Sequence, residues 1–104
     1  MLLLSIENVP GREIENALGL VKGEIVQTKH IGKDILAGFQ TLVGGEIEGY
    51  TEMIMEARKI ATARMVKEAE KLGADAIIGI RYGSSEIMQG SSEMIAYGTA
   101  VKLK

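Results

Sequence analysis

Few residues in this sequence are able to bind a metal ion. His30 is the single histidine, there is no cysteine, and Asp34 follows His30 by four residues. In a helix, residues four apart lie on the same face, so His30 and Asp34 would be able to share a metal ion. A tight zinc site, however, needs three or four well-placed ligands, which this pair does not supply. A surface histidine with one hydrogen bond is therefore the favoured interpretation, and metal binding through His30 is the alternative.

Four glutamates, at positions 46, 48, 52 and 56, surround the start of the predicted long helix. Their carboxylates suit hard cations or manganese better than zinc, so Glu46 and Glu52 join the candidate metal ligands. In the favoured interpretation Glu52 complements the positive end of the helix dipole and the other glutamates are solvated.

Gly44 and Gly45 precede this helix and would be able to form a backbone nest that holds an anion. Tyr50 would place a hydroxyl near the same ligand, although a tyrosine there also serves as a packing anchor. The sequence has neither a Walker A nor a GxGxxG pattern, which favours a tight turn at the two glycines. No catalytic residue is predicted, because there is no nucleophile elbow and the flanking serines are interpreted as turn residues: Ser84, Ser85, Ser91 and Ser92.

The sequence pattern predicts mainly strands and turns in the first part of the chain. Proline and glycine at positions 10 and 11 should end a short strand over residues 2–6. Residues 14–28 predict a second strand, in which Gly19 and Gly23 indicate a bulge or a turn. Residues 30–43 predict a short helix, since their apolar positions recur three or four apart.

Residues 52–72 give the strongest pattern in the sequence, an amphipathic helix. Thr51 would cap its start, and Gly73 would supply the left-handed residue after its last turn. The apolar face is rich in alanine and should approach a sheet closely: Ile54, Ala57, Ala61, Met65, Ala69 and Leu72.

After Asp75 the period changes to two, which predicts two strands joined by a turn at residues 89–91. In the first strand Ile78, Ile80 and Tyr82 would share one face, and Ile77, Gly79 and Arg81 the other. The last strand, over residues 94–103, would turn small residues, including Gly98, towards the alanine-rich helix. A helical crossover followed by a hairpin gives a two-layer α+β sandwich.

Length and composition set further bounds. With 104 residues, 46% hydrophobic and 25% charged, the chain should form one globular domain over residues 1–104. The net charge of −2 argues against nucleic acid as a partner. The longest uncharged run, residues 35–45, is far shorter than the roughly 20 residues that span a bilayer. We expect a protein without a membrane segment, located in the cytoplasm.

Three stretches resemble one known family: KHIGKDILAGFQTLVGGEIEGYTEMIMEAR over residues 29–58, AEKLGADAIIGIRYGSSEI over 69–87, and AYGTAVKL over 96–103. The chain is similar to YbjQ-like proteins, which are small, have no known function and in some cases carry a heavy-metal-binding label. The resemblance implies a dodecin-like β-α-β-β subunit with extra short N-terminal strands, assembled as a homopentameric ring. It supplies no catalytic residues.

Three functional hypotheses follow. The first is an oligomeric binding or structural protein with ligand sites between subunits and no resident cofactor. The second is a heavy-metal-binding protein that uses His30 with carboxylates. The third, and least favoured, is an enzyme working at a subunit interface.

Overall fold

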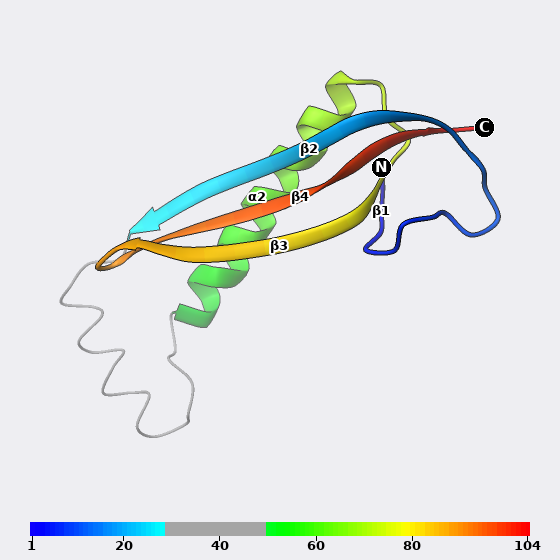
Figure 1. The fold of residues 1–104 in the computed structure, drawn as a ribbon. Coiled ribbons are helices and arrows are strands. Elements are labelled where there is room, and N and C mark those ends of the chain that lie inside the picture. The colour runs from blue at the N-terminus through cyan, green and yellow to red at the C-terminus, as the bar shows by residue number, and fades with distance from the viewer. Residues whose placement is uncertain (29–49) are drawn as a thin grey trace.

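The computed structural model describes residues 1–28 and 50–104, with side chains from residue 51 in the second range. Four strands and one helix lie in these ranges: β1 (Leu2–Leu3), β2 (Ile14–Thr28), α2 (Tyr50–Lys71), β3 (Ala76–Met88) and β4 (Ser91–Leu103). The strands form one sheet, and α2 lies across one of its faces (Figure 1). This is the predicted two-layer α+β architecture. The short helix predicted over residues 30–43 lies outside the described residues.

The strand order is β1-β3-β4-β2. β4 pairs antiparallel with both β2 and β3, so β2 and β3 run parallel to each other, and the part of the chain that contains α2 connects them. β1 adds a short parallel pair at the outer edge of β3. The predicted crossover followed by a hairpin is thus confirmed, with β4 in the middle of the sheet.

The main core lies between α2 and the sheet. Ala57, Ala61, Met65 and Ala69 form the buried stripe of the helix, as the periodicity predicted. The stripe is incomplete at both ends, where Ile54 is 40% and Leu72 48% exposed. From the sheet it meets buried residues of three strands: Val21, Ile77, Ile80, Met94, Ala96 and Ala100.

Gly23 lies under the middle of the helix. A Cβ built there would collide with the backbone of Ala61 and Met65. The prediction of a bulge or turn at Gly23 is therefore wrong: here glycine is required by the close approach of the helix. The same prediction is confirmed at Gly19, where φ is 122° and the β2–β4 register shifts.

A second cluster packs on the helix-free face. Ala76, Ile78, Val101 and Leu103 are buried there under the N-terminal segment, which contributes Val9 and the partly buried Leu4. The turn that the sequence predicted at Pro10 and Gly11 lies in this segment: the Arg12 amide donates to the Val9 carbonyl at 3.0 Å, and Gly11 has a φ of 81°.

The predicted facing of β3 is wrong at one point. Ile77 and Ile80 both belong to the helix-side cluster, whereas Ile78 belongs to the opposite one. The cause is a bulge between Ile78 and Arg81, where Gly79 has a φ of 62°. One extra residue shifts the alternation, so every side chain after the bulge changes face relative to a regular strand.

The sequence predicted the C-terminal cap of α2 correctly and its N-terminal cap incorrectly. At its C-terminal end, the Gly73 amide donates to the Glu70 carbonyl at 3.0 Å and the Ala74 amide to the Ala69 carbonyl at 3.1 Å. With a φ of 76° at Gly73, this is a Schellman motif, as the glycine predicted. At its start the helix includes Tyr50, so Thr51 lies in the first turn and is not the N-cap residue expected.

The hairpin of β3 and β4 is longer than predicted. The turn consists of residues 89 and 90 alone, since Met88 pairs with Ser91 across it. The four serines interpreted as turn residues therefore lie in strands: Ser84 and Ser85 in β3, Ser91 and Ser92 in β4. The long partner β2 explains this, because it pairs with β4 along the whole of that strand up to Ser91.

Candidate functional site: the groove between α2 and β3

Of the metal ligands predicted from the sequence, only Glu52 lies among the described residues. Glu52 lies exposed in the first turn of α2, and Tyr50 is the first residue of that helix. Within residues 1–28 and 50–104, no three His, Cys, Asp or Glu side chains come together in a way that would hold a metal ion. The other predicted site residues lie outside the described residues: His30, Asp34, Gly44, Gly45 and Glu46.

An open groove of about 460 Å³ runs between α2 and β3. Its volume falls in the range of small-molecule sites, roughly 300–1,000 Å³. The lining residues of α2 are spaced three or four apart and so lie on one side of the helix. β3 supplies the opposite wall of the groove. The lining residues are Met55, Arg58, Lys59, Thr62, Ala63 and Tyr82.

Tyr82 reaches the groove because of the bulge at Gly79. Cross-strand pairing of Tyr82 with Ala96, a residue of the helix-side core, confirms that the ring lies on the helix side of the sheet. α2 does not cover the ring fully, and Tyr82 remains 44% exposed. Part of the Tyr82 side chain is therefore available to a ligand in the groove.

Two hydroxyl groups fix the orientation of this ring. The Thr62 hydroxyl donates to the Arg58 backbone carbonyl at 2.7 Å, and the Tyr82 hydroxyl lies 2.9 Å from the same threonine oxygen. A threonine hydroxyl has one proton, which is already donated to the carbonyl. Tyr82 must therefore be the donor to Thr62, and the phenol oxygen keeps its lone pairs for a further partner.

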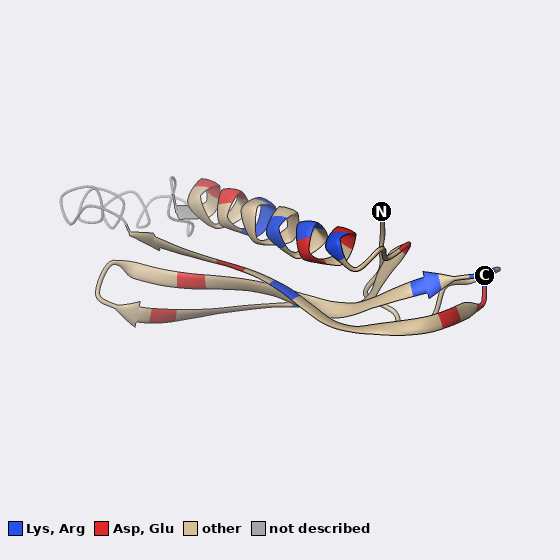
Figure 2. Cartoon of the chain, turned by 90° about the horizontal axis from the view of Figure 1, so that it is seen from above, with Lys and Arg blue, Asp and Glu red and all other residues tan. Residues whose placement is uncertain are grey.

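The rim of the groove is positively charged. Arg58 and Lys59 are both exposed. Among the described residues, neither side chain lies within ion-pair distance of a carboxylate, whereas Lys22, Lys71, Lys102 and Lys104 each do. Figure 2 shows acidic residues on the first turns of α2, basic residues in its middle, and residues of both signs towards its end. Two cations beside an apolar surface favour an anion that also carries an apolar group.

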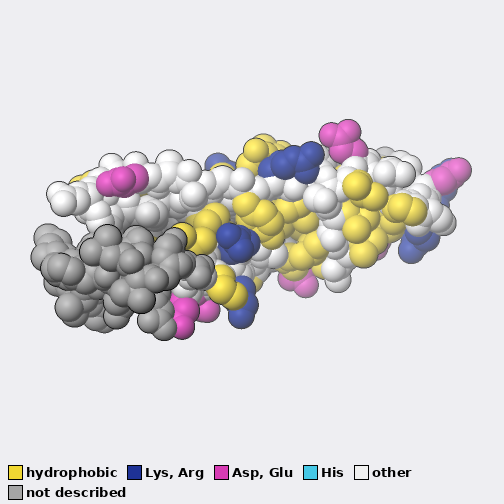
Figure 3. All heavy atoms as spheres, turned by 90° about the horizontal axis from the view of Figure 1, so that it is seen from below, with side chains coloured by type: hydrophobic (Ala, Val, Ile, Leu, Met, Phe, Trp, Pro, Cys, Tyr) yellow, Lys and Arg dark blue, Asp and Glu magenta, His cyan; other side chains and the backbone are white. Residues whose placement is uncertain are grey.

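The space-filling view shows the same combination of apolar and basic side chains. Seen from the β3 side in Figure 3, hydrophobic side chains and basic side chains lie next to each other in the middle of the molecule. This distribution fits the groove, whose residues combine apolar and basic side chains.

A second, smaller cavity of about 60 Å³ lies nearer the hairpin end of the sheet. Among the described residues, the buried Gln27 Oε1 atom has no hydrogen-bond partner, and Ser84 and Ser92 line the same cavity. One water needs only about 10–15 Å³ of such space, so the cavity has room for ordered water beside its polar atoms.

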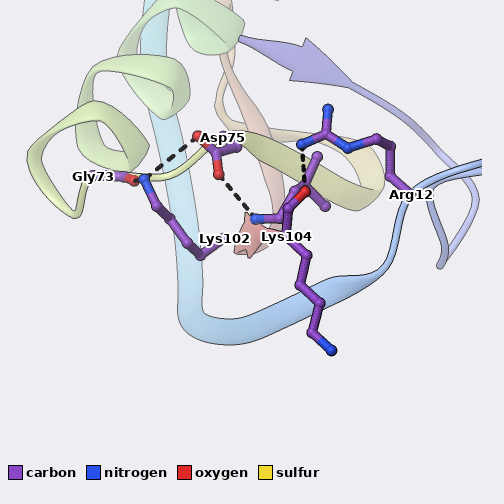
Figure 4. A network of polar contacts seen from close by, with 6 residues as sticks. Arg12, Gly73, Asp75, Lys102 and Lys104 are labelled. Atoms are coloured by element: carbon purple, nitrogen blue, oxygen red, sulfur yellow. Dashed lines mark hydrogen bonds and ion pairs between the residues drawn. The ribbon is translucent and has the colours of Figure 1, made fainter.

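Asp75 organises a polar network at the opposite end of the sheet (Figure 4). Its Oδ2 accepts from the Leu103 amide at 2.9 Å, and its Oδ1 lies 3.5 Å from the Lys102 ammonium. Lys102 also donates to the Gly73 carbonyl at 3.3 Å, which ties the end of α2 to β4. The backbone hydrogen bond from Leu103, followed by the charges of Lys102 and Arg12, lowers the pKa of Asp75 although partial burial opposes this. The network supports the fold and has no open position for a substrate.

Sequence reasoning missed the groove. Arg58 and Thr62 stand four apart, a spacing that signals a shared helix face. The position of Tyr82 relative to that face depends on the bulge, which a strict alternation cannot predict.

The fold and the groove define a class: a small two-layer α+β protein with a ligand-sized groove and, in the described residues, no assembled metal site. The chain belongs to the YbjQ_1 family, described as "Putative heavy-metal-binding", which matches residues 1–104. It is 62% identical to the UPF0145 protein of Thermotoga petrophila over 104 residues, covering 100% of this chain and 98% of that one. It is 57% identical to the UPF0145 protein of Colwellia psychrerythraea over 104 residues, covering 100% and 99%.

A solved structure shares the fold. The crystal structure of a protein of unknown function from Pediococcus pentosaceus, assigned to the DUF74 family, superposes with a TM-score of 0.70. The match covers 100% of this chain and 98% of that one at 17% sequence identity. No helix in the part of our chain that the structure describes is long and apolar enough to cross a membrane.

Proposed function

We propose that this protein is the subunit of a closed, dodecin-like ring that binds small ligands, with binding sites between its subunits. The observation that carries the proposal is the exposed helix-free face of the sheet. Leu20 is 71%, Val26 57% and Tyr97 40% exposed on that face. Exposed apolar patches of this kind are typical of subunit interfaces.

The strand edges support the same assembly. β2 ends the sheet on one side, and on the other side β1 pairs only with Ala76 and Ile77 of β3. β3 has β4 on one side. On its other, outer side, β3 has no strand neighbour from Arg81 to Met88 among the described residues. Two unpaired edges on opposite sides of a sheet favour head-to-tail contacts between copies, which close into a ring when the rotation permits. Five-fold symmetry and a cytoplasmic location are the parts of the proposal that rest on family resemblance and on the sequence.

Molecular mass in dilute solution tests the ring. We expect about five times the 11.2 kDa of one chain by light scattering. Leu20→Glu places a charge on the helix-free face and should yield smaller species. Leu72→Glu is the matched control, since Leu72 is 48% exposed at the far end of α2 and should keep the assembly. An 11 kDa particle for the unmodified protein contradicts the proposal.

The family description favours a second candidate, a heavy-metal-binding protein. In this candidate His30, Asp34, Glu46 and Glu52 would supply ligands, and a ring would bring several copies of them around one axis. The metal content of the purified protein separates the two candidates.

A further inference from the structure

We infer that the groove between α2 and β3 binds a small aromatic carboxylate, with its ring against Tyr82 and Met55 and its carboxylate at Arg58. The six lining residues all belong to one subunit. The inference therefore goes beyond the proposed ring and does not depend on it.

The charge of the groove argues for an anion with an apolar body. Arg58 and Lys59 stand at the rim without a carboxylate partner among residues 1–28 and 50–104. A guanidinium presents paired N–H donors that match a carboxylate in a bidentate geometry. Apart from these two cations, only the hydroxyls of Thr62 and Tyr82 are polar, and Thr62 already donates its proton. A nucleotide or sugar phosphate would leave many of its polar groups unpaired in such a groove.

The walls of the groove argue for an aromatic body. The Tyr82 ring is 44% exposed and is fixed by its 2.9 Å hydrogen bond to Thr62, so it offers a flat surface in a defined orientation. A rigid ring binds a second ring with little loss of conformational freedom. Met55, 51% exposed, offers a thioether that makes favourable contacts with aromatic rings. Ala63 has a small side chain, which leaves space beside the ring.

Binding of three probes to the full chain tests the inference. We would titrate 1-naphthoate, its neutral analogue 1-naphthalenemethanol, and acetate, and follow backbone and tyrosine signals by NMR. The expected result is saturable binding of 1-naphthoate, with shifts in residues 55–63 and at Tyr82, and at least about tenfold weaker binding of the other two probes. Tenfold corresponds to the loss of one charge-assisted hydrogen bond or of the apolar contact. Raising the salt concentration should weaken 1-naphthoate binding.

Matched variants locate the site. Arg58→Gln should weaken 1-naphthoate binding by about tenfold. Lys67→Gln removes the same charge from an exposed position of α2 outside the groove and should leave the affinity within about twofold. Tyr82→Leu keeps an apolar side chain but removes the ring, and should also weaken binding. Far-ultraviolet circular dichroism and the thermal midpoint establish that each variant is folded.

Three outcomes overturn the inference. One is equal affinity for 1-naphthoate and its neutral analogue, which would show an apolar patch without anion recognition. Another is an equal loss of affinity in Arg58→Gln and Lys67→Gln, which would show general electrostatic attraction. The third is groove signals that respond to protein dilution but not to 1-naphthoate, which would show that a second copy of the chain occupies the groove.

Discussion

At the scale of single residues, Gly23 determines how closely the two layers pack. A side chain at this position would meet the backbone of α2, which cannot move aside as a flexible side chain can. We expect Gly23→Ala to destabilise the protein by about 1–3 kcal/mol through overpacking, and to lower the thermal midpoint.

Gly83→Ala is the control for Gly23. It also replaces a strand glycine, but its Cβ would lie 3.4 Å from Ile95 Cγ2, the nearest atom, which is close to an ordinary contact. Thermal unfolding of both variants compares the two positions. A midpoint for Gly23→Ala equal to or above that of Gly83→Ala would mean that the helix does not approach β2 as closely as the structure shows.

Asp75 should make stability depend on pH in the acid range. Its hydrogen bond from Leu103 and the charge of Lys102 lower the pKa of the folded carboxyl. A lowered pKa means that the carboxylate stabilises the fold above its ordinary pKa of about 3.9, and that this contribution is lost as the pH falls through the lower folded value. The midpoint of Asp75→Asn should therefore lie below that of the unmodified protein at pH 6, and the gap should close below about pH 4. If the difference between the two midpoints is constant from pH 6 to pH 2, the loss of stability in Asp75→Asn comes from packing and not from the ionisation of Asp75.

At the scale of secondary structure, local signals predicted α2 and β4 well. Gly73 ends the helix in the expected left-handed conformation, and Ala57, Ala61 and Ala69 form its buried face. The two faces of β4 are also as predicted, with Ala96 and Ala100 towards the helix and Val101 and Leu103 away from it. These features follow from spacing and side-chain type within one segment.

β3 shows where such reasoning fails. Its bulge at Gly79 reverses the facing of the residues beyond it. A glycine inside a strand indicates a bulge, but this signal is not specific, because Gly23 and Gly83 are also strand glycines and have no bulge. The candidate groove was missed for the same reason, since Tyr82 joins Arg58 and Thr62 only through this bulge. A contact between two elements depends on tertiary packing, which the alternation within a single strand does not encode.

The pairing of β3 with β4 leads to a prediction for Gly98. The sequence placed Gly98 on the helix side, and this is consistent with the alternation around Ala96 and Ala100. Its nearest neighbours, however, belong to the bulge of β3: a Cβ would lie 2.8 Å from Ile77 Cγ2 and 2.9 Å from the Ile78 carbonyl oxygen. We expect Gly98→Val to cost about 1–3 kcal/mol, measured by denaturant unfolding.

The control for Gly98→Val is Thr99→Val, a half-buried neighbour on the other face of the same strand. Lys102→Val is less suitable, because Lys102 contacts Asp75 and the Gly73 carbonyl. If Gly98→Val is as stable as Thr99→Val, the close contact between β4 and the bulge is wrong.

At the scale of the whole molecule, the chain is elongated. The radius of gyration is 17.0 Å and the principal extents are 53 × 23 × 16 Å. A compact domain of about 100 residues has a radius of gyration of about 13 Å. One helix covers only one face of a long sheet, so most of the opposite face depends on other contacts for burial (Figure 1). The ring we propose would supply them.

Metal content is the measurement that separates a ring without a resident metal from the heavy-metal-binding candidate. Each chain has one histidine and no cysteine, so a single subunit lacks the imidazole and thiolate ligands that a tight zinc site needs. We expect untagged protein to be purified without a stoichiometric transition metal, as measured by elemental analysis. A site on a five-fold axis would give about one ion per five chains, and a site within each subunit about one ion per chain.

The variant His30→Ala makes this measurement decisive. If the protein carries about one ion per chain and His30→Ala loses it, the heavy-metal-binding candidate is correct and our preference is wrong. If His30→Ala retains the metal, His30 is not a required ligand, and the carboxylates, which favour hard cations such as manganese, are the next ligands to test. Glu52→Gln then tests the one predicted carboxylate ligand among the described residues, where it lies exposed in the first turn of α2 and its removal should cost little stability.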